Sequence, residues 1–137
     1  MTTKEYLSQI KKLERMIQNK LIECSQLRVI ASSVTISNDN ERVKTSPEKD
    51  KIGAVVSKIV DIENEVDRMI DKRCSIVDQI DDINDTDMYD ILAKVYILGR
   101  DLKVIAIERG VTYRHISRLY KSAITEFERK YGSEYLS

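Results

Sequence analysis

Residues 101–127 read DLKVIAIERGVTYRHISRLYKSAITEF and carry the pattern of two short helices joined by a tight turn. A first helix from about Leu102 to Arg109 presents apolar side chains at helical spacing. Gly110 can adopt the left-handed conformation that reverses the chain, and Thr112 is suited to cap a second helix. This order predicts a helix-turn-helix, a motif whose second helix enters the major groove of DNA.

The two short helices also carry the apolar residues that would pack them together. In the second helix the first two inward positions follow Gly110 by six and nine residues. Val111 is expected to fill the turn between the helices. The predicted inward residues are Leu102, Ile105, Ala106, Ile116, Leu119, Tyr120, Ala123 and Phe127.

Basic residues lie on the opposite face of the second helix. At 100° per residue, Arg114, Arg118, Lys121 and Thr125 fall within a band of about 60°. No acidic residue lies within positions 113–125, although the whole chain has formal net charge +0. Segregated positive charge on a neutral chain favours nucleic-acid binding, whereas a solubilising face is the alternative.

The chemistry of these side chains predicts separate roles in DNA binding. Arg114 and Arg118 have the planar donor fork that matches guanine O6 and N7, and His115 and Ser117 could add shorter base contacts. Contacts to phosphate position the protein without reading sequence. They are predicted from the side chains of Arg100, Lys103 and Lys121 and from the backbone N–H groups of Thr112 and Tyr113.

Two long amphipathic helices are predicted before this segment, over residues 3–31 and 47–83, with a polar loop at 32–46. Ser46, Pro47 and Glu48 suit the start of the second helix. Folded back on each other, the helices would form a coiled-coil-like antiparallel hairpin. Their apolar steps are Leu7, Ile10, Leu13, Ile17, Leu21, Cys24 and Leu27, then Ile52, Val55, Ile59, Ile62, Val66, Met69, Ile76, Ile80 and Ile83.

The predicted hairpin also has a predicted register and a predicted partner. Cys24 should lie opposite about Ala54, and Cys74 opposite about Lys4. The two thiols would then not meet, and both would serve as small apolar residues at helix interfaces. Because two helices alone bury little surface, their apolar stripes should continue into a second copy of the chain or onto the C-terminal domain, and we expect a homodimer.

An acidic segment precedes the predicted helix-turn-helix, with five carboxylates between Asp81 and Asp90. No glycine-containing loop of calcium-binding spacing accompanies them, so helix capping is the favoured interpretation over a metal site. Asn84 or Asp85 would cap a helix that runs to Leu98 and ends at Gly99. The predicted domains are therefore a hairpin over residues 1–83 and a DNA-binding domain over residues 84–137.

Several classes of protein are not favoured by the sequence. Residues 1–16 lack the apolar segment of a secretory signal, and no apolar run approaches the roughly 18 residues of a membrane span, so a cytoplasmic location without membrane contact is expected. His115 is the single histidine, and no glycine-rich phosphate loop is present. We expect no enzyme activity, no cofactor and no metal.

Residues 88–127, with YILGRDLKVIAIERGVTYRHISRLYKSAI at their centre, resemble region 4, the promoter-reading C-terminal domain of bacterial sigma-70-type factors. The whole chain resembles small phage and prophage proteins of Gram-positive bacteria, and regulators of the ArpU and RinA types share the general plan. One departure is visible, because Arg109 precedes Gly110 where an apolar residue is usual, and Ile107 stands where a polar one is usual. The matching residues are Tyr96, Ile97, Gly99, Ile105, Ala106, Gly110, Val111, Thr112 and 118–123, together with the segments KEYLSQIKKLERMI, SPEKDKI and IENEVDRMIDKR.

The resemblance implies an all-α protein with an N-terminal helical hairpin and a sigma region 4-like C-terminal domain. It implies a phage or prophage transcriptional regulator that binds double-stranded DNA, with host RNA polymerase as a possible further partner. The alternative is an interaction factor that binds polymerase or another host protein through the hairpin and the sigma-like domain. A purely structural coiled coil would leave the placement of Gly110 and the acid-free helix face unexplained.

Overall fold

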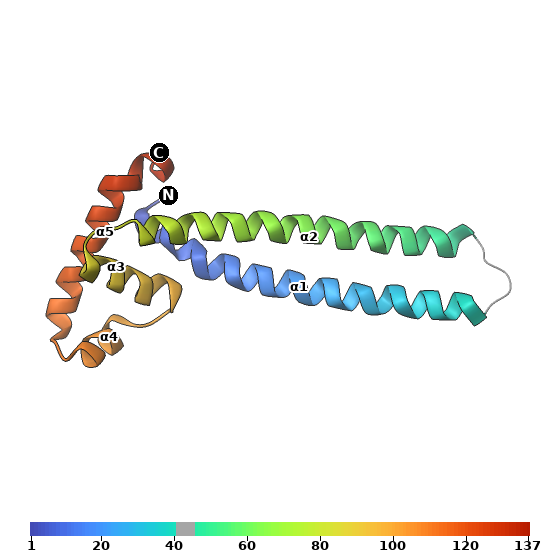
Figure 1. Ribbon diagram of the computed structural model, residues 1–137, viewed down its shortest axis with the longest axis horizontal. Coiled ribbons are helices and arrows are strands. Elements are labelled where there is room, and N and C mark those ends of the chain that lie inside the picture. The colour runs from blue at the N-terminus through green and yellow to red at the C-terminus, as the bar shows by residue number, and fades with distance from the viewer. Residues whose placement is uncertain (41–45) are drawn as a thin grey trace. The chain divides into compact units, whose positions relative to one another are not determined.

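The computed structural model describes residues 1–40 and 46–137, and every regular element in these ranges is a helix. This confirms the predicted all-α class. In chain order the elements are α1 (Thr3–Asn40), α2 (Ser46–Asp81), α3 (Thr86–Leu92), the π-helical turn η1 (Ala93–Ile97), α4 (Leu102–Arg109) and α5 (Tyr113–Tyr135) (Figure 1).

The predicted polar loop at 32–46 is wrong over most of its length, because α1 continues to Asn40. Residues 32–40 contain neither glycine nor proline. Extending an existing helix through serine, threonine and asparagine costs little compared with nucleating a new one. Only residues 41–45 of the predicted loop lie outside the described residues. The start of α2 at Ser46 is within one residue of the prediction.

The longer α1 also changes the register of the two long helices. Glu14 accepts hydrogen bonds from Arg73 at 3.0 and 2.6 Å, and the Sγ atom of Cys24 lies 3.8 Å from the carbonyl oxygen of Ile59. The predicted pairing of Cys24 with Ala54 is therefore wrong, because the extension of α1 moves each partner further along α2. Cys24 is buried as expected, whereas Cys74 is exposed and does not pack at a helix interface.

The chain divides into two compact units at different places from the predicted boundary after residue 83. Residues 1–14 and 72–137 form one unit, here called the head, and residues 15–71 form the other, here called the hairpin unit. The physical reason is packing, because the first turns of α1 and the last turns of α2 share a core with the C-terminal helices. That shared core comprises Leu7, Ile10, Ile76, Ile80, Ile83, Ile91, Leu92, Tyr96, Ile105, Ala106, Ile116, Ala123 and Phe127.

Aromatic side chains join α1 to α5 inside the head. The rings of Tyr6 and Tyr135 are stacked with centroids 4.1 Å apart, and Phe127 is fully buried beside them. The hydroxyl of Thr3 donates to Glu128 at 2.9 Å and lies 2.8 Å from the hydroxyl of Tyr135. The start of the chain is thus part of the head and not only of the predicted hairpin.

In the hairpin unit α1 and α2 lie side by side and run in opposite directions (Figure 1). Their core is small, consisting of the buried residues Cys24, Ile59, Ile62 and Val66 with partly buried neighbours. Leu21 was predicted on the inner stripe but is 50% exposed. Within the described residues, no helix is both long enough and apolar enough to cross a membrane.

The acidic segment before α3 serves as a helix cap. The carboxylate of Asp85 accepts a hydrogen bond from the backbone N–H of Met88 at 3.0 Å. In the part of the chain that the structure describes, no three side chains of His, Cys, Asp or Glu are grouped to hold a metal ion. The predicted continuous helix to Leu98 instead changes to η1 after Leu92, and Gly99 follows with φ of 72°.

Candidate nucleic-acid interface

The turn between α4 and α5 has the predicted conformation. Gly110 ends α4 with φ of 67° and ψ of 33°, which is the left-handed region that glycine adopts without strain. The N–H of Val111 donates to the carbonyl of Ala106 at 3.0 Å, and Thr112 Oγ1 accepts from the N–H of His115 at 3.1 Å. Val111 does not fill the turn as expected, because 38% of its surface is exposed.

The inward faces of α4 and α5 hold the two helices together. Ile105, Ile116 and Phe127 are fully buried, and Ala106 is 4% exposed at the point where a small side chain lets the helices approach closely. Leu119 and Tyr120 are partly buried against the same core. The predicted inward residues are confirmed, and they fix which face of α5 remains open to solvent.

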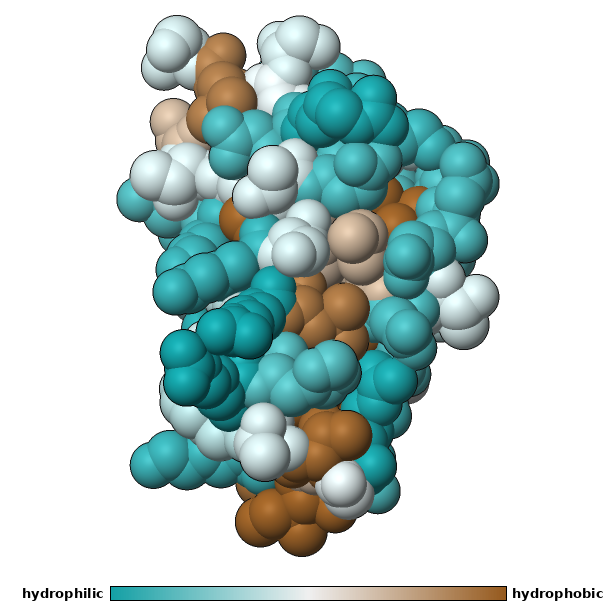
Figure 2. All heavy atoms as spheres, turned by 90° about the vertical axis from the view of Figure 1, so that its left-hand side faces the viewer, coloured by the Kyte–Doolittle hydropathy of each residue, from teal (hydrophilic) through white to brown (hydrophobic). Residues whose placement is uncertain are grey.

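The open face of α5 carries cations that have no ion-pair partner in the part of the chain that the structure describes. Arg114, Arg118 and Lys121 are exposed, and none of them forms a salt bridge with any residue that the structure describes. Figure 2 shows that hydrophilic side chains cover much of the molecular face on which α5 lies. Unpaired cations on a rigid helix are available to an external anion such as DNA phosphate or to a base edge.

The other predicted base-reading and N-terminal residues lie around these cations. His115 is exposed and Ser117 is half-buried, so Ser117 borders the cationic face instead of projecting from it. Thr112 and Tyr113 are exposed at the start of α5, and Tyr113 retains 50% of its surface. The first N–H groups of a helix have no partner within the helix, which makes this end suited to a phosphate.

The two predicted phosphate-binding side chains at or just before the start of α4 differ from each other. The guanidinium of Arg100 donates to Glu108 at 2.7 Å, whereas Lys103 is exposed and forms no ion pair within residues 1–40 and 46–137. A surface ion pair of this kind contributes about 0–1 kcal/mol, so phosphate could compete for Arg100. Lys103 needs no such exchange and is the more available of the two.

Two basic residues near this site were missed because they lie about a hundred positions away in sequence. The Nζ atom of Lys4 is 5.6 Å from the ring centroid of Tyr120, which lies on α5. A methyl group on Gly99 would lie 3.2 Å from Cε of Lys11, next to Arg100. No local signal could have found Lys4 or Lys11, because their placement follows from α1 packing in the head.

Arg109, which departs from the usual motif, links α4 to α3. Its Nη2 atom donates to Asp87 at 2.9 Å, and its Nη1 atom lies 3.6 Å from a carboxylate oxygen of Asp90. A cation in this position therefore holds the first helix of the turn against α3. The neighbouring Ile107 is 80% exposed and takes no part in the core.

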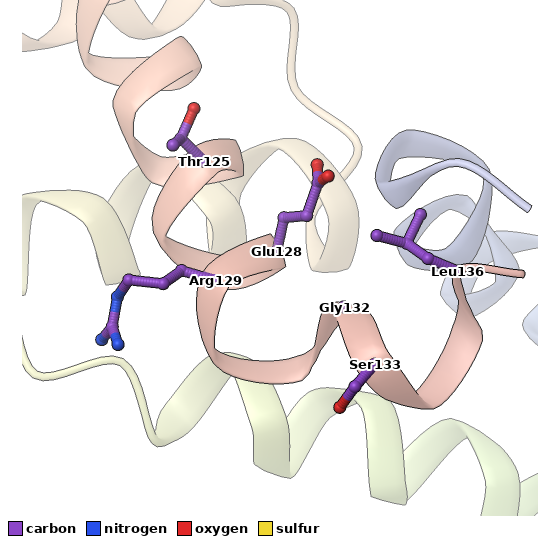
Figure 3. A pocket seen from close by; sticks show the side chains of 6 residues that line it. All are labelled: Thr125, Glu128, Arg129, Gly132, Ser133 and Leu136. Carbon is purple, nitrogen blue, oxygen red and sulfur yellow. The ribbon is translucent and has the colours of Figure 1, made fainter.

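An open hollow of about 540 Å³ lies along the last turns of α5 (Figure 3). Both of its ionisable side chains have partners in the protein, because Glu128 accepts from Thr3 and Arg129 donates to Glu126. In this respect the hollow differs from the cationic face of α5, whose basic side chains form no ion pair within the described residues. The lining residues are Thr125, Glu128, Arg129, Gly132, Ser133 and Leu136.

Comparison with known proteins adds no assignment for this site. No family model matches the sequence, and neither a curated protein nor a solved structure matches the chain. The resemblance to sigma region 4 therefore rests on the quoted residues alone, and the functional interpretation rests on the geometry of the head.

Proposed function

We propose that α4 and α5 form a DNA-binding helix-turn-helix and that the chain is a sequence-specific transcriptional regulator of phage or prophage origin. The observation that supports this most directly is a set of three exposed cations on α5 that form no ion pair with any described residue, namely Arg114, Arg118 and Lys121. They follow a glycine turn and a threonine cap that set the angle between the two helices. The proposed role is binding and not catalysis, with no cofactor.

The proposed complex places the N-terminal half of α5 in the major groove, which is about 12 Å wide and accepts one helix. Arg114 and Arg118 read guanine edges, and His115 and Ser117 add contacts beside them. Lys103 and Lys121 bind phosphate on the borders of the groove, together with the first N–H groups of α5. The C-terminal half of α5 stays in the protein core and holds this geometry.

The test is selection of bound sequences from a random DNA pool with the full chain, followed by titration of Arg114→Ala and Arg118→Ala on the selected site. Each variant should bind that site about 1 to 3 kcal/mol more weakly, because a bidentate contact to guanine is lost. Lys103→Ala should weaken specific and nonspecific binding alike and lower the salt slope by about one.

Arg129→Ala is the matched control for these variants, since Arg129 lies on the same helix but is bonded to Glu126. Its affinity for the selected site should equal that of the unmodified chain. If the double variant of Arg114 and Arg118 keeps full affinity and the same preferred sequence, the proposal is wrong.

A second function has one observation in its favour. Figure 2 shows hydrophobic side chains gathered at the lower end of the viewed face, where α4 lies, and on that helix Ile107 is 80% and Val104 44% exposed. Exposed apolar side chains are suited to a protein contact, so the alternative is a factor that binds host RNA polymerase or another host protein. Binding of purified polymerase that Ile107→Lys abolishes, with no sequence preference for DNA, would favour this alternative.

A further inference from the structure

In the hairpin unit, α1 carries a second stripe without charge that does not face α2. It contains Gln18, Leu21, Ile22, Ser25, Val29 and Ser32, at helical positions within a band of about 100°. The apolar members are well exposed, with 50% of Leu21, 57% of Ile22 and 64% of Val29 accessible. The buried stripe through Ile17, Cys24 and Leu27 lies roughly 120° away around the helix.

The neighbouring helix has two exposed valines on the same side of the hairpin unit, on a face that also carries Glu63 and Asp67. Val56 and Val60 on α2 are 48% and 49% exposed. Arg28 of α1 donates to Glu63 of α2, and these residues lie within about 20° of Leu21 and Val56 around their own helices. This side of the hairpin unit, bounded by Leu21, Val29, Val56 and Val60, is called the outer flank below.

We propose that the outer flank is covered by the same flank of a second copy of this chain, with α1 of each copy packed against α2 of the other. Two long helices that share a small core are a weak unit alone, and four such helices enclose a continuous core. The apolar side chains of the outer flank supply the second layer of that core. No other segment described in this chain covers the flank.

Charge selects the second copy and its orientation. Residues 15–33 of α1 carry three basic and one acidic side chains, whereas residues 50–71 of α2 carry three basic and six acidic ones. Lys20 and Arg28 pair with Glu65 and Glu63 of their own chain, and α1 packed on the partner's α2 still joins a net positive helix to a net negative one. In the opposite orientation, with the two-fold axis across the hairpin unit, α2 of each copy would pack against α2 of the other. Glu63 and Asp67 would then face the acidic α2 of the partner.

The favoured orientation has a two-fold axis along the length of the hairpin unit, so that every helix has antiparallel neighbours. The points at which the two chains enter their heads, at residues 15 and 71, then lie at the same end of the bundle. On the proposed function, this presents two DNA-reading heads to one site with two-fold symmetry.

The first test measures the mass of the full chain in solution across a range of concentrations. The unmodified chain should be a dimer, and Leu21→Glu and Val29→Glu should each weaken dimerisation at least tenfold by placing a carboxylate against the acidic partner helix. Gln26→Glu, which is exposed and lies about 90° around α1 from the middle of that stripe, is the control and should remain dimeric. Circular dichroism checks that each variant keeps its helices. If the unmodified chain is still monomeric at 100 μM, the proposal is overturned.

The second test measures orientation with a spin label at residue 71 in the Asp71→Cys variant, with Cys24→Ala and Cys74→Ser in the background. Labels at the same end of the bundle should be less than about 30 Å apart, given interhelical spacings of 8–10 Å. The opposite orientation would separate them by about 40 Å, from the rise of 1.5 Å per residue on either side of Val56 and Val60. A dimer that binds no DNA would contradict the proposed function alone, and a DNA-binding monomer would contradict the dimer alone.

Discussion

The two halves of α5 carry similar numbers of basic residues but use them differently. In the N-terminal half, Arg114, Arg118 and Lys121 are exposed and form no ion pair within the described residues. In the C-terminal half, Arg129 donates to Glu126 and Lys130 lies 2.8 Å from Asp82. A basic residue on a helix is therefore a poor guide to binding until its neighbours in the fold are known.

The packing of the two halves differs in the same way. Residues Phe127, Tyr131 and Tyr135 bind α5 to the rest of the head, and the ring of Phe127 lies 5.2 Å from that of Tyr131. The N-terminal half presents one buried edge and one open face. The C-terminal half thus anchors the helix, and the N-terminal half is free to meet a ligand.

The largest expected effect is on the anchoring half. Phe127→Ala should lower the free energy of unfolding of the head by about 3 to 5 kcal/mol, because it removes a fully buried ring and leaves a cavity. Arg118→Ala should change that free energy by less than about 0.5 kcal/mol, because the side chain is exposed. Urea denaturation followed by circular dichroism measures both, and equal losses would contradict the division of α5 into two roles.

The turn that positions the N-terminal half should be the next most sensitive place. Gly110→Ala should cost about 1 to 2 kcal/mol of folding free energy, because φ of 67° strains a residue with a side chain. A methyl group there would meet no atom within 4 Å, so the cost arises from the backbone alone.

Gly53→Ala is a matched control for that substitution. Gly53 lies within α2, and its added methyl group would also meet no atom within 4 Å. This variant should stabilise the chain by roughly 0.5 to 1 kcal/mol, because alanine favours the helix. Denaturation curves in which Gly110→Ala is as stable as the unmodified chain or more stable would contradict the strained turn.

Removing the partner of Arg129 would give the C-terminal half of α5 an unpaired cation like those of the N-terminal half. Glu126→Gln should free Arg129, which lies within about 20° of Arg118 around the helix. Binding to nonspecific DNA should then tighten modestly, and the slope of log affinity against log salt should steepen by up to about one. Fluorescence anisotropy at several salt concentrations measures this, and an unchanged slope would show that the DNA-binding surface stops before Arg129.

The smallest expected effect is on the pH dependence of folding stability, through the contacts of the C-terminal half of α5 with Asp82. Hydrogen bonds from Lys130 and Tyr131 lower the pKa of Asp82 below its ordinary value of 3.8. A lowered pKa stabilises the fold above pH 3.8, and this contribution is lost as pH falls through the folded-state pKa. Thermal unfolding at pH 5 and pH 3 should show a smaller acid-induced decrease for Asp82→Asn than for the unmodified chain.

Tyr131 provides the alkaline counterpart of that experiment. Burial, together with the hydrogen bond to Asp82, raises the pKa of Tyr131 to about 12. Stability from this phenol is complete below pH 10 and is lost as pH rises from 10 towards 12. Tyr131→Phe should lack that alkaline loss, and an unchanged alkaline profile would argue against the Asp82 contact.

Local patterns predicted much of the fold, and their failures have identifiable causes. Periodicity located α4 and the start of α5 because each helix has its apolar residues on one face, and Gly110 marked the turn because few residues tolerate its φ. The predicted second helix ended at Phe127, whereas α5 continues to Tyr135. The end of α1 was misplaced because polar residues without glycine or proline permit either a loop or a helix. The register of α1 and α2 depended on that end and was therefore also misplaced.

The candidate site was predicted in its local chemistry but not in its surroundings. The exposure of Arg114, Arg118 and Lys121 followed from helical geometry. The pairing of Arg100 with Glu108, the placement of Lys4 beside Tyr120, and the use of Arg109 to hold α3 did not. Each of these contacts joins residues whose separation in sequence carries no periodic signal.

The sequence by itself determined the helices, the turn at Gly110 and the cationic face of α5, because each depends on residues within a few turns of one another. Only the tertiary structure decided that residues 1–14 belong to the head, which cations are already paired, and which apolar side chains of the hairpin unit remain exposed. Those outcomes depend on how helices distant in sequence pack, because burial and ion pairing are properties of surfaces brought together by the whole chain.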